Sequence, residues 1–129
     1  MLEARQFRNA ILCEDIREEA GNKKSLMGVF GGDVWVNNFP AQLRVAFYAE
    51  YLPNADLHDL QFTLSLSENK IAEGAIQIPA DRKQVVTLAI PQGVLLLKEP
   101  GDIVLRVGFA DEMLEILRKK VQLAPNLAS

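Results

Sequence analysis

Histidine and cysteine each occur only once in this sequence of 129 residues, as His58 and Cys13. A single cysteine excludes an internal disulfide and a thiolate metal cluster within one chain, so packing must hold the fold together. A hydroxyl or thiol nucleophile normally needs a histidine within hydrogen-bond reach, and nothing in the sequence brings His58 to Cys13. We therefore interpret Cys13 as a buried packing residue and His58 as a solvated loop residue, and we expect no enzymatic activity.

Phosphate-binding features are also missing. Gly31 and Gly32 are adjacent, but neither the spacing nor the lysine of a nucleotide-binding loop accompanies them. No run of Lys and Arg is long enough to follow a nucleic-acid backbone, and 17 acidic against 14 basic residues give a formal charge of -3. We expect no cofactor and no nucleic-acid partner.

Long apolar segments are absent as well. No stretch approaches the roughly 20 apolar residues of a transmembrane helix, and residues 1–15 contain no apolar run of signal-peptide length. These absences predict a cytoplasmic protein without a membrane partner. The length and the uniform, ordinary globular composition predict one domain, residues 1–129, with a flexible arm over residues 1–8 and a flexible tail over residues 124–129.

Alternation of apolar and polar residues is the main pattern that is present. It is clearest over residues 41–52 and 60–66, where every second side chain is apolar. Turn-forming residues, among them Pro91-Gln92-Gly93, interrupt the chain about every ten positions. The predicted strands between these turns are residues 24–30, 33–37, 41–52, 60–66, 71–78, 83–90 and 102–109.

Residues 10–18 fit a helix as well as a strand. We favour a strand, because Gly21-Asn22 follows as a two-residue hairpin turn. A strand places Glu14 between the apolar residues Leu12 and Ile16 unless a bulge re-aims it. The dense charges of this hairpin are interpreted as a guard against pairing of an edge strand with other chains; they are Glu14, Asp15, Arg17, Glu18, Glu19, Lys23 and Lys24.

Residues 113–123 are equally ambiguous, since their apolar positions suit one face of a helix or of a strand. We choose a strand because Ala110-Asp111-Glu112 resembles a hairpin loop. About eight short strands without helix–strand alternation then predict an all-β fold. The expected architecture is a single-domain antiparallel β-sandwich with Greek-key, C2-like or immunoglobulin-like connections.

Large apolar side chains are more numerous than one inward sheet face can hold, and Trp and Tyr are enriched where protein surfaces meet. Any one of them also fits the packed interior. Together they predict a protein-binding surface, including self-association through a sheet edge or face. The candidate binding residues are Trp35, Phe39, Tyr48, Tyr51, Leu95 and Leu97, the last two within the run Val94-Leu95-Leu96-Leu97.

Aspartates in predicted turns suggest an alternative function, a C2-like or lectin-like module that binds calcium or a small ligand through its end loops. Calcium needs about six to eight oxygen ligands, and no loop has a dense D-x-D-x-D spacing. Turn formation explains these residues equally well. The candidate ligands are Asp33, Asp56, Asp59 and Asp111.

The first third of the chain carries a recognisable pattern. Asn-x-x-Leu-Cys-Glu is followed by Arg and Glu, then by Gly and Lys, and then by Gly-Val-Phe. The pattern resembles the opening of a family of small uncharacterised bacterial and phage-associated β-sandwich proteins. The resemblance implies the sandwich fold and carries no activity. The matching positions are Asn9, Leu12, Cys13, Glu14, Arg17, Glu19, Gly21, Lys23 or Lys24, Gly28, Val29 and Phe30.

Overall fold

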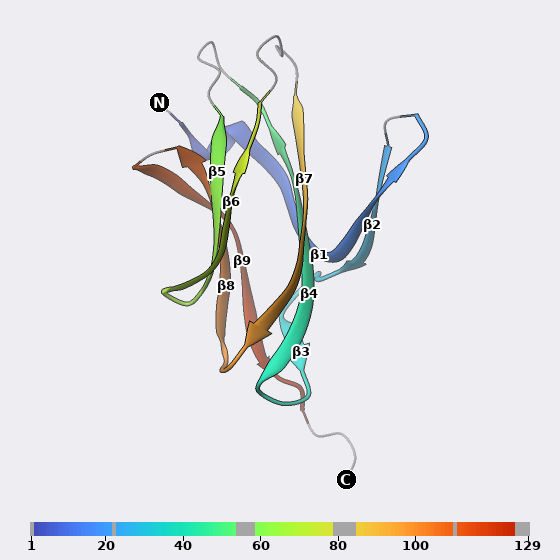
Figure 1. Ribbon diagram of the computed structural model, residues 1–129, viewed down its shortest axis with the longest axis vertical. Coiled ribbons are helices and arrows are strands. Elements are labelled where there is room, and N and C mark those ends of the chain that lie inside the picture. Colours follow the sequence, from blue (N-terminus) through green and yellow to red (C-terminus); the bar gives the residue numbers. More distant parts are fainter. Residues whose placement is uncertain (1, 22, 54–58, 79–84, 110, 126–129) are drawn as a thin grey trace.

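The computed structural model describes residues 2–21, 23–53, 59–78, 85–109 and 111–125. Apart from one 3-10 turn, η1 (Ala4–Gln6), the elements of these residues are strands (Figure 1). The predicted all-β class is therefore confirmed. The strands are β1 (Phe7–Glu19), β2 (Lys23–Val29), β3 (Val34–Val36), β4 (Ala41–Tyr51), β5 (Leu60–Leu66), β6 (Asn69–Ile76), β7 (Val86–Leu97), β8 (Gly101–Phe109) and β9 (Glu112–Leu123).

Two sheets pack against each other. Sheet A has the order β2-β1-β4-β7, and sheet B has the order β3-β9-β8-β5-β6. The described residues thus form nine strands where about eight were predicted. The expectation of purely antiparallel pairing is wrong at one place, because β3 runs parallel to β9. The reason is that the chain leaves sheet A after β2 and crosses to the far edge of sheet B before β3 begins.

The core lies between the sheets and follows the predicted alternation in β4 and β5. Phe47 of sheet A and Phe62 of sheet B meet edge to face, with ring centroids 5.0 Å apart. Aromatic rings prefer this geometry to a face-to-face sandwich, so the contact helps to set how the two sheets lie on each other. The largest fully buried side chains are Leu12, Val34, Val45, Phe47, Tyr51, Leu60, Leu64, Leu88, Leu97, Ile103, Val104 and Leu105.

The segment expected to be a flexible N-terminal arm is packed over residues 2–8. Leu2 is buried in the core, and Phe7 begins β1 and stacks on Tyr51 with ring centroids 5.1 Å apart. Gln6 is also buried, and its side-chain amide donates to the carbonyl of Leu52 at 3.1 Å. Its backbone carbonyl accepts from the Leu52 amide at 2.7 Å, so two hydrogen bonds hold this segment in place.

The first hairpin forms as predicted, although its connection spans residues 20–22 rather than two residues, because Glu19 opposes Lys23. Asn22 lies outside the described residues. Glu14 is not re-aimed by a bulge. It stays in solvent, packed over Gly28, because the hairpin of β1 and β2 extends beyond sheet B (Figure 1).

The turn predicted at Pro91-Gln92-Gly93 is wrong, because these residues lie inside the continuous strand β7. Opposite them, the pairing of β7 with β4 shifts by one residue between Val45 and Ala46, which is a β-bulge. The long neighbouring strand β4 pairs with β7 on both sides of the bulge. The strand chosen for residues 113–123 is confirmed as β9.

Candidate interaction surface

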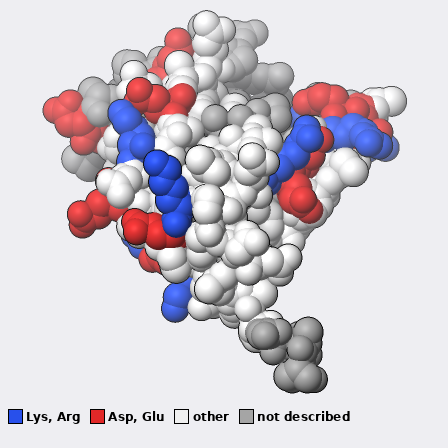
Figure 2. All heavy atoms as spheres, turned by 60° about the horizontal axis from the view of Figure 1, so that its bottom comes forward, with Lys and Arg blue, Asp and Glu red and all other residues white. Residues whose placement is uncertain are grey.

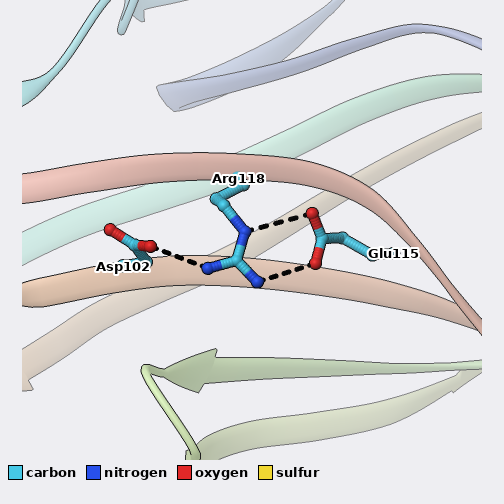
Figure 3. A network of polar contacts seen from close by, with 3 residues as sticks. All are labelled: Asp102, Glu115 and Arg118. Atoms are coloured by element: carbon cyan, nitrogen blue, oxygen red, sulfur yellow. Dashed lines mark hydrogen bonds and ion pairs between the residues drawn. The ribbon is translucent and has the colours of Figure 1, made fainter.

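The outer face of sheet B is built for contact with water. Arg118 on β9 donates from Nε and Nη2 to the two carboxylate oxygens of Glu115, at 3.1 and 2.8 Å, and from Nη1 to Asp102 at 2.7 Å (Figure 3). These hydrogen bonds hold the pKa of Glu115 below its ordinary value. Every charge of this network has a partner of opposite sign, as expected on a solvated sheet face.

The outer face of sheet A has a different character. Because Val45 and Phe47 point into the core, Ala46 and Tyr48 point outward, and their neighbours on the other strands follow from the register. Large apolar side chains stand at both edges of this face: Met27 is 41% exposed and Val29 52% on β2, and Val94 is 63% exposed and Leu96 54% on β7.

We call the outward residues of this sheet the A face. Two strands, β1 and β4, separate these edges, and their outward side chains are mixed: Ile11, Cys13, Ala46 and Tyr48 are small or apolar, and Asp15, Arg17, Gln42, Arg44 and Glu50 are polar or charged. Seen with the lower end of Figure 1 turned forward, charged side chains gather on two flanks of the molecule (Figure 2). The apolar members of the A face are Ile11, Cys13, Met27, Val29, Ala46, Tyr48, Ala89, Val94 and Leu96.

Two pairs of opposite charges bridge β1 and β4 on the A face. Asp15 and Arg44 lie 3.7 Å apart near its middle. At its border, Glu50 accepts from Arg8 Nε at 2.7 Å and from the Tyr48 hydroxyl at 3.0 Å. The hydrogen bond from Arg8 is the main cause that lowers the pKa of Glu50, whereas burial and the bond to Glu50 raise the pKa of Tyr48.

Cys13 lies under the centre of this face and is fully buried. Its thiol is within hydrogen-bond distance of two backbone carbonyls, Asp15 at 3.4 Å and Ala46 at 3.6 Å. Burial is the main cause that raises the pKa of the Cys13 thiol, and it outweighs the backbone hydrogen bonds that lower this pKa. The thiol therefore remains neutral, as a packing residue would. His58 lies outside the described residues.

Three of the predicted binding residues lie in the core and cannot form a surface: Tyr51, Leu95 and Leu97 are buried. The sequence identifies the apolar run of residues 94–97 but not which of its side chains point into the core. The bulge in β7 decides this, because it shifts the alternation of inward and outward residues. The exposed members of that run are Val94 and Leu96 instead.

The other predicted binding residues lie in two places. Tyr48 is half-buried on the A face. Trp35 is 51% exposed but belongs to β3 at the edge of sheet B, where it lies opposite Gln122 of β9. Phe39 is half-buried in the connection from β3 to β4. Met27 and Val29 were not among the predicted binding residues. The signal that could have identified them is their place in a predicted hairpin whose dense charges are typical of an edge strand.

The aspartates proposed as calcium ligands do not form one site. Asp33 precedes β3, which pairs with the end of β9, whereas Asp111 precedes the start of β9. Ten strand residues separate these two places, which is roughly 30 Å. Asp33 accepts from Gln122 Nε2 at 2.6 Å, and Asp59 accepts from the Ile78 amide at 2.9 Å. Asp56 lies outside the described residues, and within those residues no group of three or more His, Cys, Asp or Glu side chains could hold a metal ion.

Comparisons with protein-family models, with curated proteins and with solved structures find no match. In the described part of the chain, no helix has the length and apolar character needed to cross a membrane.

Proposed function

We propose that this protein is a non-enzymatic, protein-binding β-sandwich and that the A face is its binding surface. The supporting observation is the contrast between the two outer sheet faces. Sheet B carries an interlocked ion-pair network and exposes Trp35 and Leu123 where β3 pairs with the end of β9, whereas sheet A carries four exposed large apolar side chains along its two edges. Exposed apolar patches bounded by polar residues mark interaction sites on soluble proteins.

The composition of the A face suits a protein partner. Burial of Val94 and Leu96 removes apolar surface from water, at about 25 cal/mol per Å². The paired charges of Asp15 and Arg44 supply orientation, since charges at an interface contribute more to specificity than to affinity.

The proposal extends to the finer architecture and the setting. We infer a single domain over residues 1–129 with Greek-key connections, in a cytoplasmic protein of bacterial or phage origin. Support for the connectivity comes from β4 and β7, which are neighbours in sheet A although β5 and β6, which lie between them in the chain, belong to sheet B.

Site-specific photo-crosslinking in cells of the source organism tests this function. A photoreactive amino acid replaces Val94 on the A face in one variant and exposed Lys120 on the outer face of sheet B in a matched control. We expect covalent protein adducts from position 94 and none from position 120. Adducts that are absent from position 94, or equally abundant from both positions, contradict a binding role for the A face.

A further inference from the structure

We propose that the partner on the A face is a second copy of this chain, related by a twofold axis that runs along the boundary between β1 and β4. This inference rests on the proposed function, because it uses the same face. A symmetric contact between identical chains requires a surface that is complementary to itself. The A face meets that requirement in charge, in apolar character and in area.

The register of sheet A shows why this axis is special. Residues of β1 oppose residues of β4 in antiparallel pairs, among them Cys13 with Ala46 and Ile11 with Tyr48. A rotation of 180° about an axis that lies in the interface, parallel to these strands and midway between them, stacks the two faces. Each β1 residue of one copy then lies over its own β4 counterpart in the other copy.

This rotation brings opposite charges together. Asp15 and Arg44 are counterparts across the boundary, so Asp15 of each copy faces Arg44 of the other. Arg8 and Glu50 are also counterparts, and they face each other in the same way at the border of the interface. The same axis leaves no charge of these two pairs opposite a charge of its own sign.

Two exposed apolar residues, Met27 and Val94, meet under the same rotation. Strands β2 and β7 lie outside β1 and β4, at equal distances from the axis, so they exchange places. Met27 opposes Asp15, and Val94 opposes Arg44, and therefore Met27 of one copy meets Val94 of the other. They are two of the four exposed large apolar side chains of the sheet, and both leave water in the dimer.

The area is also appropriate. At a strand spacing of about 4.8 Å, β1 and β4 stack over the 11 residues of β4, and β2 and β7 stack over the 7 residues of β2, which gives a face of roughly 600 Å². Stable protein interfaces bury about 800 Å² on each partner. Face-to-face stacking of two twisted sheets is itself a common packing geometry, with the strands of the two sheets within about 30° of each other.

Charge reversal with the full-length chain tests the axis. By sedimentation velocity over a range of concentrations, we expect the unaltered protein to form dimers. Arg44→Asp places two pairs of carboxylates face to face, and Asp15→Arg places two pairs of guanidinium groups face to face. Each variant alone is expected to raise the dimer dissociation constant by more than about 10-fold, because opposed like charges cost several kcal/mol.

An equimolar mixture of the two variants should dimerise again, because each contact between the two chains then joins opposite charges. Both variants lose the same exposed ion pair within their own sheet, so only the arrangement between copies explains recovery in the mixture. Glu73→Arg, which reverses a charge paired with Lys70 on β6 of sheet B, is the matched control and should leave the dimer unchanged. Circular dichroism establishes that each variant is folded.

Three results overturn the dimer. The unaltered chain is monomeric at every concentration, or both single variants dimerise as it does, or the mixture remains monomeric. The photo-crosslinking experiment separates this failure from failure of the proposed function. A monomeric chain that still crosslinks a different protein from position 94 retains the binding role and loses only the identity of the partner.

Discussion

Gly108 of β8 lies opposite Met113 of β9, where there is no room for a side chain. A Cβ atom at this position would lie 2.8 Å from the carbonyl carbon of Glu112 and 2.9 Å from the Cα of Met113. Both are backbone atoms of the neighbouring strand, so no side-chain rotation relieves the overlap. The glycine is therefore required by the pairing of the two strands.

We predict that Gly108→Ala lowers the free energy of unfolding by about 3 kcal/mol, at the upper end of the cost of overpacking. Urea denaturation measures the change. Gly32→Ala is the matched control, because a Cβ there meets nothing within 4 Å, and its effect should stay within about 0.5 kcal/mol. Equal stability of the two variants would contradict the close approach.

The Cys13 thiol provides a second test on a single side chain. Since it is fully buried and burial raises its pKa, a thiol reagent should leave it unmodified in the native protein and modify it rapidly in urea. The unfolded thiol ionises at lower pH than the folded one. The contribution of Cys13 to stability is thus complete at neutral pH and is lost as pH rises through the folded pKa.

Measured stability should accordingly decline less on the alkaline side in Cys13→Ala than in the unaltered chain, although the variant starts from a lower value. Modification of the native thiol at the rate seen in urea would show that Cys13 is accessible, contrary to its position under the A face.

At the scale of paired strands, Arg118 on β9 links this strand to β8 through its hydrogen bond to Asp102. Its bidentate contact with Glu115 lowers the pKa of that carboxyl group. A lowered pKa contributes stability above the unfolded value, and that contribution is lost as pH falls through the folded value. Exposure of these side chains keeps the effect small.

We predict that Glu115→Gln lowers the melting temperature by at most a few degrees at neutral pH. The difference from the unaltered protein should vanish in acid, where Glu115 is protonated, and shrink in concentrated salt. Glu73→Gln, which removes a carboxylate with a single lysine partner, serves as the control and should have a smaller effect. A difference that persists in acid would mean that the loss is not electrostatic.

The proposed dimer makes the thermal stability of the whole molecule depend on its concentration. Only the folded chain presents the A face, so mass action favours folding as concentration rises. We predict that the melting temperature of the unaltered chain increases by a few degrees for each tenfold increase in concentration. Scanning calorimetry measures this trend, which should be absent in Arg44→Asp.

Calcium should not stabilise the molecule. Asp33 lies at the opposite end of β9 from Asp111, and Asp59 is engaged by the Ile78 amide, so these oxygens do not converge on one ion. We predict equal melting temperatures in millimolar calcium and in a chelator. A rise with calcium that the chelator reverses would restore the alternative function of a calcium-binding module.

Local periodicity was sufficient to predict much of this fold. The strict alternation in β4 and β5 identified strands and their buried faces, because one-sided burial in a sheet imposes a period of two on the residues themselves. Turn residues located most strand ends for the same local reason. The lone cysteine could be read as a packing residue from composition alone.

Pairing between distant segments decided the rest. The bulge in β7 depends on its alignment with β4, and it turned Leu95 and Leu97 inward and left Val94 and Leu96 in solvent. The crossing of β3 to sheet B took Trp35 away from the A face. Asp15 and Arg44 are far apart in the chain and face each other only across the boundary of β1 and β4. Such contacts depend on which strands become neighbours, and no local pattern specifies that choice.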